Sequence, residues 1–420
     1  MNKAKPGDKV KIITDKEEFE GILIPRPELL EKGFTVIKLD NGYNIGIEDK
    51  KIKQIKLLEK YIQKKSISKK LPMKKGLPTV SIISLGGTIS SKVDYRTGGV
   101  IADYTAEDFV AMMPELANIA NLKAKKVMNI MSEDLTGKDY TKIAKIIADE
   151  LKQADGVVVT QGTDTLHFST AAMSFMLKDL NKPVIFTAAQ RSIDRGSSDA
   201  FMNLVCAITA AAKSDIAEVV ACLHATTNDD YCILNRGTKV RKMHTSRRDA
   251  FRPVNELPIA KVHSDGKIEI VNKDYNKRKK GTVNLENKFE EDVGLIFTYP
   301  GIKPEVIDYY KNYKGLVIAA TGLGNIPANL FPKIEKLKIP VVIAPQTIYG
   351  RVHPLVYAHL RELSIKLKCI FTEDITPETA YVKLGWVLAQ TTDPKKVKEL
   401  MLTNIAGEIT KRSEEKSFLY

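Results

Sequence analysis

The chain has 420 residues and a net charge of +14, with 43% hydrophobic and 28% charged residues, which is ordinary for a globular protein of two or three domains. No apolar run reaches the roughly 18 residues that a membrane span requires, and the first residues, MNKAKPGD, lack the apolar segment of a secretory signal. These features exclude a membrane or secreted class, so we expect a cytoplasmic protein with no membrane partner.

The positive charge is concentrated near the N-terminus. Residues 1–75 carry 19 Lys and Arg against 11 Asp and Glu, so more than half of the excess lies in less than a fifth of the chain. Such an asymmetry points to an anionic partner such as RNA. The alternative is a solvated lysine-rich surface without a binding role, and the sequence leaves both interpretations open.

Residues 1–57 contain four short segments that alternate polar and apolar side chains, as half-buried β-strands do. The turn signal Asp40-Asn41-Gly42 separates the last two. We predict a small β-barrel that serves for docking and carries no catalytic group. The predicted strands are 9–13, 18–24, 34–39 and 43–47.

A charged connector follows the β-domain. Residues 50–78 hold eleven lysines and a single acid, Glu59, and two prolines and a glycine near the end interrupt any helix. We predict a lysine-rich linker over 58–78.

From Thr79 the pattern changes to apolar, β-branched runs that alternate with amphipathic helical patterns. This alternation is typical of a parallel sheet with helices on both faces. Over residues 79–285 we predict a Rossmann-like α/β domain, with a hairpin at 259–271. Its predicted strands are 80–85, 126–130, 156–161, 184–189 and 218–224, and its predicted helices are 105–113, 138–153, 166–180 and 197–213.

A second polar connector at 273–291 precedes a smaller C-terminal α/β domain, which we place at 290–420. We predict that it ends in an amphipathic helix over 394–413. The other predicted elements are strands near 293–298, 315–320, 340–345 and 368–372, and helices near 304–312, 328–336, 354–366 and 377–390.

The four cysteines, at positions 206, 222, 232 and 369, form no CxxC pair, and no pair of histidines lies near them. We therefore predict buried structural thiols and no zinc site.

Two predicted strands end in loops that contain hydroxyl side chains. The first loop is Gly86-Gly87-Thr88-Ile89 and the second is Gly162-Thr163-Asp164-Thr165. Strand ends are common places for sites in α/β folds, and glycines let a ligand approach the backbone closely. The alternative for the second loop is that Asp164 and Thr165 only cap the following helix.

A threonine hydroxyl is a weak nucleophile and needs a base, for which a lysine can serve. The segment 237–248 supplies two candidates, Lys239 and Lys242. The alternative is that this segment is only an exposed basic loop.

In order, spacing and strand context, the two threonine loops and the downstream lysine resemble the L-asparaginase/glutaminase amidohydrolase family, over about residues 79–413. The resemblance implies a two-domain α/β amidohydrolase in which Thr88, the usual nucleophile, and Thr163 are the active-site threonines. It also implies that Asp164 and Lys242 complete a Thr–Lys–Asp triad with Thr163.

Lys242 matches the family better than Lys239, because the family places its lysine shortly before a Thr/Ser-rich stretch that ends in Phe, here Phe251. By the same resemblance Tyr95 lies on a mobile loop and helps to activate Thr88. The implied reaction is hydrolysis of a side-chain amide through an acyl-enzyme, which needs no metal or organic cofactor in this chain.

The resemblance also implies a set of substrate-binding residues. Ser132 and Glu133 match the segment that holds the α-amino and α-carboxylate groups of the substrate, although many bacterial enzymes have glutamine where this chain has Glu133. Gly87 and Gly162 adjoin the two threonines. Asn325 is expected to reach the site of a neighbouring subunit in a close dimer, and the alternative is that its loop is a plain strand-end turn.

The basic β-domain in front of the amidohydrolase resembles the asparaginase-like subunit family of archaeal glutamyl-tRNA(Gln) amidotransferases. That resemblance implies hydrolysis of glutamine and transfer of ammonia to a partner, the E subunit of the amidotransferase, which uses ATP and Mg to convert Glu-tRNA(Gln) into Gln-tRNA(Gln). It implies a D2E2 heterotetramer built on a homodimer of this chain, with tRNA bound mainly by the partner. The alternatives are a free cytoplasmic L-asparaginase with an accessory domain and a non-catalytic module that binds RNA or protein.

Overall fold

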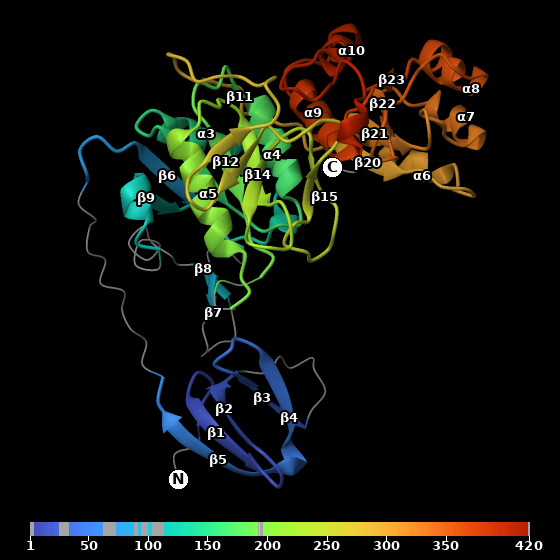
Figure 1. The fold of residues 1–420 in the computed structure, drawn as a ribbon. Helices are drawn as coiled ribbons and strands as arrows, with labels where there is room; N and C mark the ends of the chain where they lie inside the picture. Colours follow the sequence, from blue (N-terminus) through green and yellow to red (C-terminus); the bar gives the residue numbers. More distant parts are fainter. Residues whose placement is uncertain are drawn as a thin grey trace.

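The computed structural model shows an α/β protein with a small β-domain at its N-terminus (Figure 1). Within the part of the chain that it describes, no helix is long and apolar enough to cross a membrane. The middle of the predicted linker and nearly all of the predicted helix at 105–113 lie outside the described residues, which are 4–24, 33–61, 73–87, 91–93, 100–102, 113–191, 193 and 196–418.

The N-terminal domain contains the strands β1 (Lys9–Thr14), β2 (Glu18–Leu23), β3 (Phe34–Lys38), β4 (Asn44–Glu48) and β5 (Ile52–Glu59) and a 3₁₀ turn at Asp49–Lys51. The strands form one antiparallel sheet in the order β4-β3-β2-β1-β5. Val10, Ile12, Ile37 and Ile47 form its core. The first part of the predicted connector at 50–78 thus contains a strand, β5, whose residues are mostly exposed and do not alternate in the way those of a half-buried strand do.

The larger sheet contains the strands β6 (Thr79–Ser84), β9 (Asn121–Lys126), β10 (Gly156–Thr160), β12 (Val184–Thr187), β13 (Val219–His224), β14 (Tyr231–Arg236), β17 (Ala260–His263) and β18 (Ile268–Ile270). Their order is β18-β17-β14-β13-β12-β10-β6-β9. Neighbours from β9 to β13 are parallel, whereas β14, β17 and β18 are antiparallel. The predicted α/β class is confirmed, and the sheet is mixed rather than wholly parallel.

The strand predicted at 126–130 was wrong, because the structure has β9 at Asn121–Lys126. β9 is an edge strand whose lysines point to solvent, so it lacks the apolar run that identifies its buried neighbours. β14 was not predicted at all, although it links the parallel part of the sheet to the hairpin.

Helices cover both faces of the larger sheet (Figure 1). On β10, Val157 and Val159 pack in the cluster that contains α3 and α4, and Val158 packs in the cluster that contains α5. The alternation follows from the two-residue period of a strand. These helices are α3 (Gly137–Leu151), α4 (Leu166–Met176) and α5 (Ala200–Lys213), and a short α2 (Leu116–Ile119) adjoins α5.

The second unit is a parallel sheet of β20 (Val293–Phe297), β21 (Gly315–Ala320), β22 (Val341–Pro345) and β23 (Ile370–Phe371) with the helices α6 (Glu305–Asp308), α7 (Phe331–Ile334), α8 (Ala358–Arg361), α9 (Pro377–Leu388) and α10 (Pro394–Leu402). Short 3₁₀ or π turns at Tyr309–Asn312, Ala328–Leu330 and Glu362–Lys366 adjoin the first three helices, and another lies at Glu415–Ser417. The final helix, predicted over 394–413, ends at Leu402. The Glu408 carboxylate accepts hydrogen bonds from the backbone N–H groups of Ile405 and Ala406 and folds that segment into a turn.

The part of the chain that the structure describes also contains three pairs of short strands: β7 (Ser91–Val93) with β8 (Val100–Ala102), β11 (Leu177–Lys178) with β19 (Asn284–Leu285), and β15 (Val240–Lys242) with β16 (Phe251–Pro253).

One hydrophobic core joins the two sheets through α4 and α9. Phe175 and Trp386 are stacked with ring centroids 5.9 Å apart, and both are buried. The indole N–H of Trp386 donates to the carbonyl of Glu286 at 3.1 Å, so its polar atom is satisfied. Residues 237–254, which include β15, pass this junction and contact both units.

Candidate functional site

Thr163 and Asp164 lie between the end of β10 and the start of α4. Thr165 occupies the N-cap position, but its side chain makes no capping hydrogen bond. Its hydroxyl donates instead to the carbonyl of Ser132 at 2.5 Å. The Asp164 carboxylate pairs with a lysine. The side chains of Thr165 and Asp164 therefore do not simply cap the helix, because both bind partners outside it.

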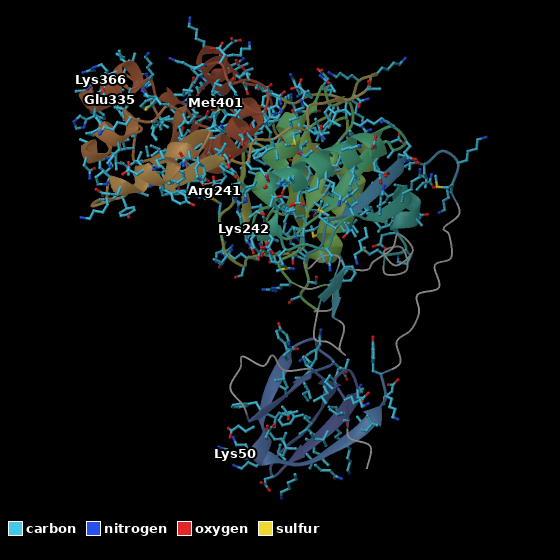
Figure 2. All side chains as sticks on the ribbon, turned by 180° about the vertical axis from the view of Figure 1, so that it is seen from behind. Lys50, Arg241, Lys242, Glu335, Lys366 and Met401 are labelled. Carbon is cyan, nitrogen blue, oxygen red and sulfur yellow. The ribbon has the colours of Figure 1, made fainter. Side chains whose placement is uncertain are left out.

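Lys242, the last residue of β15, contacts two residues of this loop. Its amino group lies 2.8 Å from Thr163 Oγ1 and 2.5 Å from Asp164 Oδ1. The Lys242 side chain is 10% exposed and that of Asp164 is 63% exposed. In Figure 2, Lys242 and Arg241 lie side by side near the boundary between the two units. The structure thus brings together all three members of the predicted triad.

Lys239, the other candidate, lies elsewhere. Its amino group is 2.7 Å from the carboxylate of Asp374 in the second unit, and both side chains are fully buried. Burial lowers the pKa of Lys239 against the opposing effect of Asp374. The choice of Lys242 agrees with this geometry.

The first threonine loop approaches the second through glycines. Gly86 and Gly87 both have positive φ, +117° and +82°, which glycine adopts without strain. A Cβ on Gly87 would lie only 2.5 Å from the backbone nitrogen of Gly162. The two loops therefore touch backbone to backbone. Thr88 and Tyr95, the other predicted catalytic residues, lie outside the described residues.

Ser132 and Glu133 lie in a 3₁₀ turn at Ser132–Asp134. Ser132 is buried, and a Cβ on Gly162 would lie 3.0 Å from its hydroxyl oxygen. That hydroxyl donates to Glu133 at 3.4 Å, and Glu133 is exposed. The predicted substrate-binding residues Ser132 and Gly162 are thus in contact beside Thr163.

Gln190 is a neighbour of Thr163 that the sequence analysis missed. Its Oε1 lies 3.5 Å from Thr163 Oγ1, the same distance as Asp164 Oδ1, so the single hydroxyl proton has two possible acceptors. The backbone N–H of Gln190 donates to the buried Asp199. Gln190 follows β12, which is adjacent to β10. Parallel strands end at the same edge of a sheet, so the place of Gln190 just after a predicted strand was the feature of the sequence that could have identified it.

His167, in the first turn of α4, stays neutral beside this cluster. Burial, and then the positive charges of Arg241 and Lys242, lower its pKa to about 3. Its Nδ1 is buried and has no hydrogen-bond partner among the described residues. The imidazole therefore adds no charge near Lys242 at neutral pH.

Asn325 lies in the loop after β21 in the second unit. Its backbone forms two hydrogen bonds with Thr321, of 2.8 and 3.0 Å. Among the described residues no hydrogen bond joins Asn325 to Thr163, Asp164 or Lys242. Its expected contribution to a neighbouring subunit stays a prediction.

Chemically, the arrangement places one amine between a hydroxyl and a carboxylate. The amine can exchange a proton with Thr163 while Asp164 fixes its position, which are the requirements for a lysine that activates an oxygen nucleophile. Within the residues that the structure describes, no group of three or more His, Cys, Asp and Glu side chains is arranged to hold a metal ion. All four cysteines are buried and unbridged.

Three family models match the chain in succession. Residues 4–58 match the GatD N-terminal domain. Residues 79–276 match the N-terminal domain of asparaginase, and residues 292–401 match the glutaminase/asparaginase C-terminal domain.

Curated relatives match nearly the whole chain. It is 50% identical to the D subunit of the glutamyl-tRNA(Gln) amidotransferase of Pyrococcus furiosus, over 98% of this chain and 97% of the relative. It is 46% identical to the protein of the same name from Methanobrevibacter smithii, over 98% and 96%.

Among solved structures, the thermostable L-asparaginase from Thermococcus kodakarensis aligns with a TM-score of 0.71 and 28% identity, over 79% of this chain and 99% of that chain. L-asparaginase I from Vibrio cholerae aligns with a TM-score of 0.69 and 28% identity, over 80% and 100%.

Proposed function

Because the chain belongs to the family formed by the D subunits of glutamyl-tRNA(Gln) amidotransferases, we propose that it hydrolyses glutamine and supplies the ammonia that converts Glu-tRNA(Gln) into Gln-tRNA(Gln). The observation that carries the proposal is the position of the Lys242 amino group, 2.8 Å from Thr163 Oγ1 and 2.5 Å from Asp164 Oδ1. A lysine held between a hydroxyl and a carboxylate is suited to activate that hydroxyl for attack on an amide carbon.

In the first half-reaction a threonine hydroxyl oxygen attacks the side-chain amide carbon of glutamine. The hydroxyl proton passes to the leaving nitrogen, the carbon–nitrogen bond breaks, and ammonia leaves an ester between threonine and the γ-glutamyl group. In the second half-reaction water attacks the ester, and glutamate and the free threonine result. Thr163, Lys242 and Asp164 form the described part of this relay, and by family resemblance Thr88 is the second threonine.

Ser132 and Glu133 are proposed to hold the α-amino and α-carboxylate groups of the substrate. Support comes from the contact of Ser132 with Gly162, the residue immediately before Thr163. Gly87 and Gly162 are proposed to line the substrate site, because their lack of side chains permits the substrate to approach the backbone closely.

The complete reaction is a ligation that a second polypeptide performs. We propose that the E subunit of the amidotransferase is this partner, and that it binds Glu-tRNA(Gln), activates the glutamyl γ-carboxylate with ATP and Mg, and receives the ammonia. This chain would then form a homodimer at the centre of a D2E2 assembly in the cytoplasm, with Asn325 completing the neighbouring site. The names of the relatives support the reaction and the existence of a complex.

The test measures ammonia release from glutamine by the full chain alone, with the partner subunit, and with partner, Glu-tRNA(Gln) and ATP. We expect release to rise when the partner and its substrates are present, and Thr163→Ala to abolish it. Rapid asparagine hydrolysis by the isolated chain, indifferent to partner and tRNA, would refute the amidotransferase function.

That outcome would instead establish the second candidate, a free L-asparaginase with an accessory N-terminal domain. The observation that favours this candidate is the structural similarity to two L-asparaginases over about four fifths of the chain. Residues 4–58, which match the GatD N-terminal domain, favour the first.

A further inference from the structure

The strand that carries Lys242 has its two faces directed toward different units. Val240 is buried in the core shared with α4, and Lys242 points to Thr163. Arg241, which lies between them on the strand, and Lys239, in the turn just before it, contact carboxylates of the second unit. Adjacent side chains on a strand point to opposite faces. One short segment therefore presents one residue to the site and two cations to the neighbouring unit.

The first of these contacts is fully enclosed. Lys239 Nζ lies 2.7 Å from Asp374 Oδ2 and 3.2 Å from the Asp374 carbonyl oxygen, and neither side chain is exposed. The other carboxylate oxygen of Asp374 accepts the backbone N–H of Thr410 at 3.0 Å. The Asp374 carboxylate is thus held by Thr410 on one oxygen and by Lys239 on the other.

The second contact lies one residue from Lys242. Arg241 Nη2 is 2.8 Å from Glu378 Oε1, with 21% and 8% of the two side chains exposed. Glu378 lies in the first turn of α9, which Thr376 caps by accepting the N–H of Thr379. The Thr379 hydroxyl in turn donates to the carbonyl of Thr238 at 3.0 Å. The start of α9 and the start of β15 are therefore bound together.

We propose that Asp374 and Glu378 are positioning residues for Lys242: two carboxylates of the second unit hold the strand whose lysine contacts Thr163. This inference rests on the proposed function of that site. A lysine amine sits on a flexible four-carbon stem, so its distance from the Thr163 hydroxyl depends on a fixed backbone. A misplacement of about 1 Å at a reacting group can cost a hundredfold in rate.

Stability alone does not explain these ion pairs. Replacing a buried ion pair by well-packed apolar residues is often neutral or stabilising, so such a pair is weak evidence for a role in stability. Two separate pairs on positions 239 and 241, each with a carboxylate from the other unit, instead fix the direction of one strand. Val240 lies between the two paired positions, and Lys242 follows the second of them directly.

The test uses Glu378→Gln in the full chain, in complex with its partner subunit, with glutamine as substrate. The amide keeps the size of the carboxylate and removes its charge, so Arg241 loses its ionic partner. We expect kcat for ammonia release to fall by about tenfold while KM changes by less than about twofold, because the substrate-binding turn at Ser132–Asp134 is not touched.

A matched control is Glu150→Gln. Glu150 is as buried as Glu378, at 7% against 6%, and it pairs with Lys125 and accepts from Ser81 at the far end of α3. We expect this variant to keep its kcat. An equal loss of kcat in both variants, or a wild-type kcat in Glu378→Gln, would overturn the positioning role.

Rescue separates positioning from folding. In the double variant Arg241→Glu with Glu378→Arg the ion pair is restored with its charges exchanged, so we expect kcat within about threefold of the wild type. A double variant no better than Glu378→Gln contradicts the proposal.

Thr163→Ala tests the proposed function itself. If this variant still hydrolyses glutamine, both the proposed function of the site and the positioning role are refuted. If Thr163→Ala is inactive but Glu378→Gln has normal activity, only the positioning role is refuted.

Discussion

Lys239 and Lys242 lie three residues apart, yet their amino groups have opposite surroundings. Lys239 is fully enclosed against Asp374, whereas Lys242 reaches the exposed carboxylate of Asp164 and the hydroxyl of Thr163. Lys239 lies in the turn that precedes β15, and Lys242 is the last residue of that strand. One lysine therefore pairs with a carboxylate of the second unit, and the other contacts Thr163 and Asp164 of the candidate site.

Lys242→Met should lower glutamine hydrolysis at least about a thousandfold without unfolding the protein, since groups that act as a unit fail together. The measurement is ammonia release at saturating glutamine, with circular dichroism to check folding. Lys261→Met is the control, because Lys261 lies over the ring of Tyr231 on a distant part of the sheet. Near-normal turnover of Lys242→Met would show that another base serves Thr163.

Gly87→Ala should reduce activity by about a hundredfold, because displacement of the loop at Gly162 misplaces the reacting groups. The new methyl group would lie 2.5 Å from the Gly162 nitrogen at a φ of +82°. Gly301→Ala is a matched control with a φ of +83° and no atom within 4 Å of the added carbon. Equal activity of the two variants would show that the contact between the loops at Gly87 and Gly162 does not govern the position of the reacting groups.

The buried His167 predicts a pH dependence of stability. Its folded-state pKa of about 3 lies below the unfolded value of 6.5, so acid protonates the unfolded chain first. The stabilisation is complete above pH 6.5 and is lost as the pH falls toward 3, by about 2 kcal/mol at pH 5.

Denaturant unfolding at pH 7.5 and pH 5 tests this. His167→Gln should reduce the difference in unfolding free energy between the two pH values, and the exposed His359→Gln should leave it unchanged. The expectation fails if both variants retain the full difference.

Asp374→Asn should destabilise the protein by about 3–5 kcal/mol, because it leaves the buried Lys239 without a charge partner. The double variant Lys239→Met with Asp374→Asn removes the unpaired amine, and the asparagine oxygen still accepts the N–H of Thr410. We expect the double variant to regain part of the lost unfolding free energy in urea. A double variant less stable than the single one would contradict this account.

Removing residues 1–61 should leave the rest of the chain folded, because the core of the N-terminal sheet is a separate cluster. Thermal unfolding of the shortened chain should keep its midpoint within about 3 °C. Association with the partner subunit, measured by co-elution in gel filtration, should weaken. Unchanged association would remove the docking role of the β-domain, and aggregation of the remainder would show that the domain is integral to the fold.

The buried strands and the long helices could be predicted from the sequence because their apolar periodicity is strong. β10 and α3 begin within one residue of their predicted starts. The edge strand β9 was misplaced because half of its residues are lysines and it has no apolar run. β5 was overlooked because its apolar residues do not alternate with polar ones and most of the strand is exposed. Local pattern also could not predict that β14 would continue the sheet antiparallel to its neighbour.

For the site, the motifs predicted the contact of Lys242 with Thr163 and Asp164. The sequence did not predict Asp374 and Glu378, which lie more than 130 residues from the strand that they contact. No periodicity or spacing connects a carboxylate to a cation at that separation. Tertiary packing alone brings them together.

The strand that holds Lys242 also bears on how this protein can be engineered. The two halves of the amidohydrolase match separate family models, so they look like interchangeable modules. The lysine, however, belongs to the first half while its strand is anchored in the second. A chimera that exchanges the second half between relatives would therefore have to carry positions 238–241 with it, or Lys242 would lose its position beside Thr163 even though Thr163, Asp164 and Lys242 were all retained.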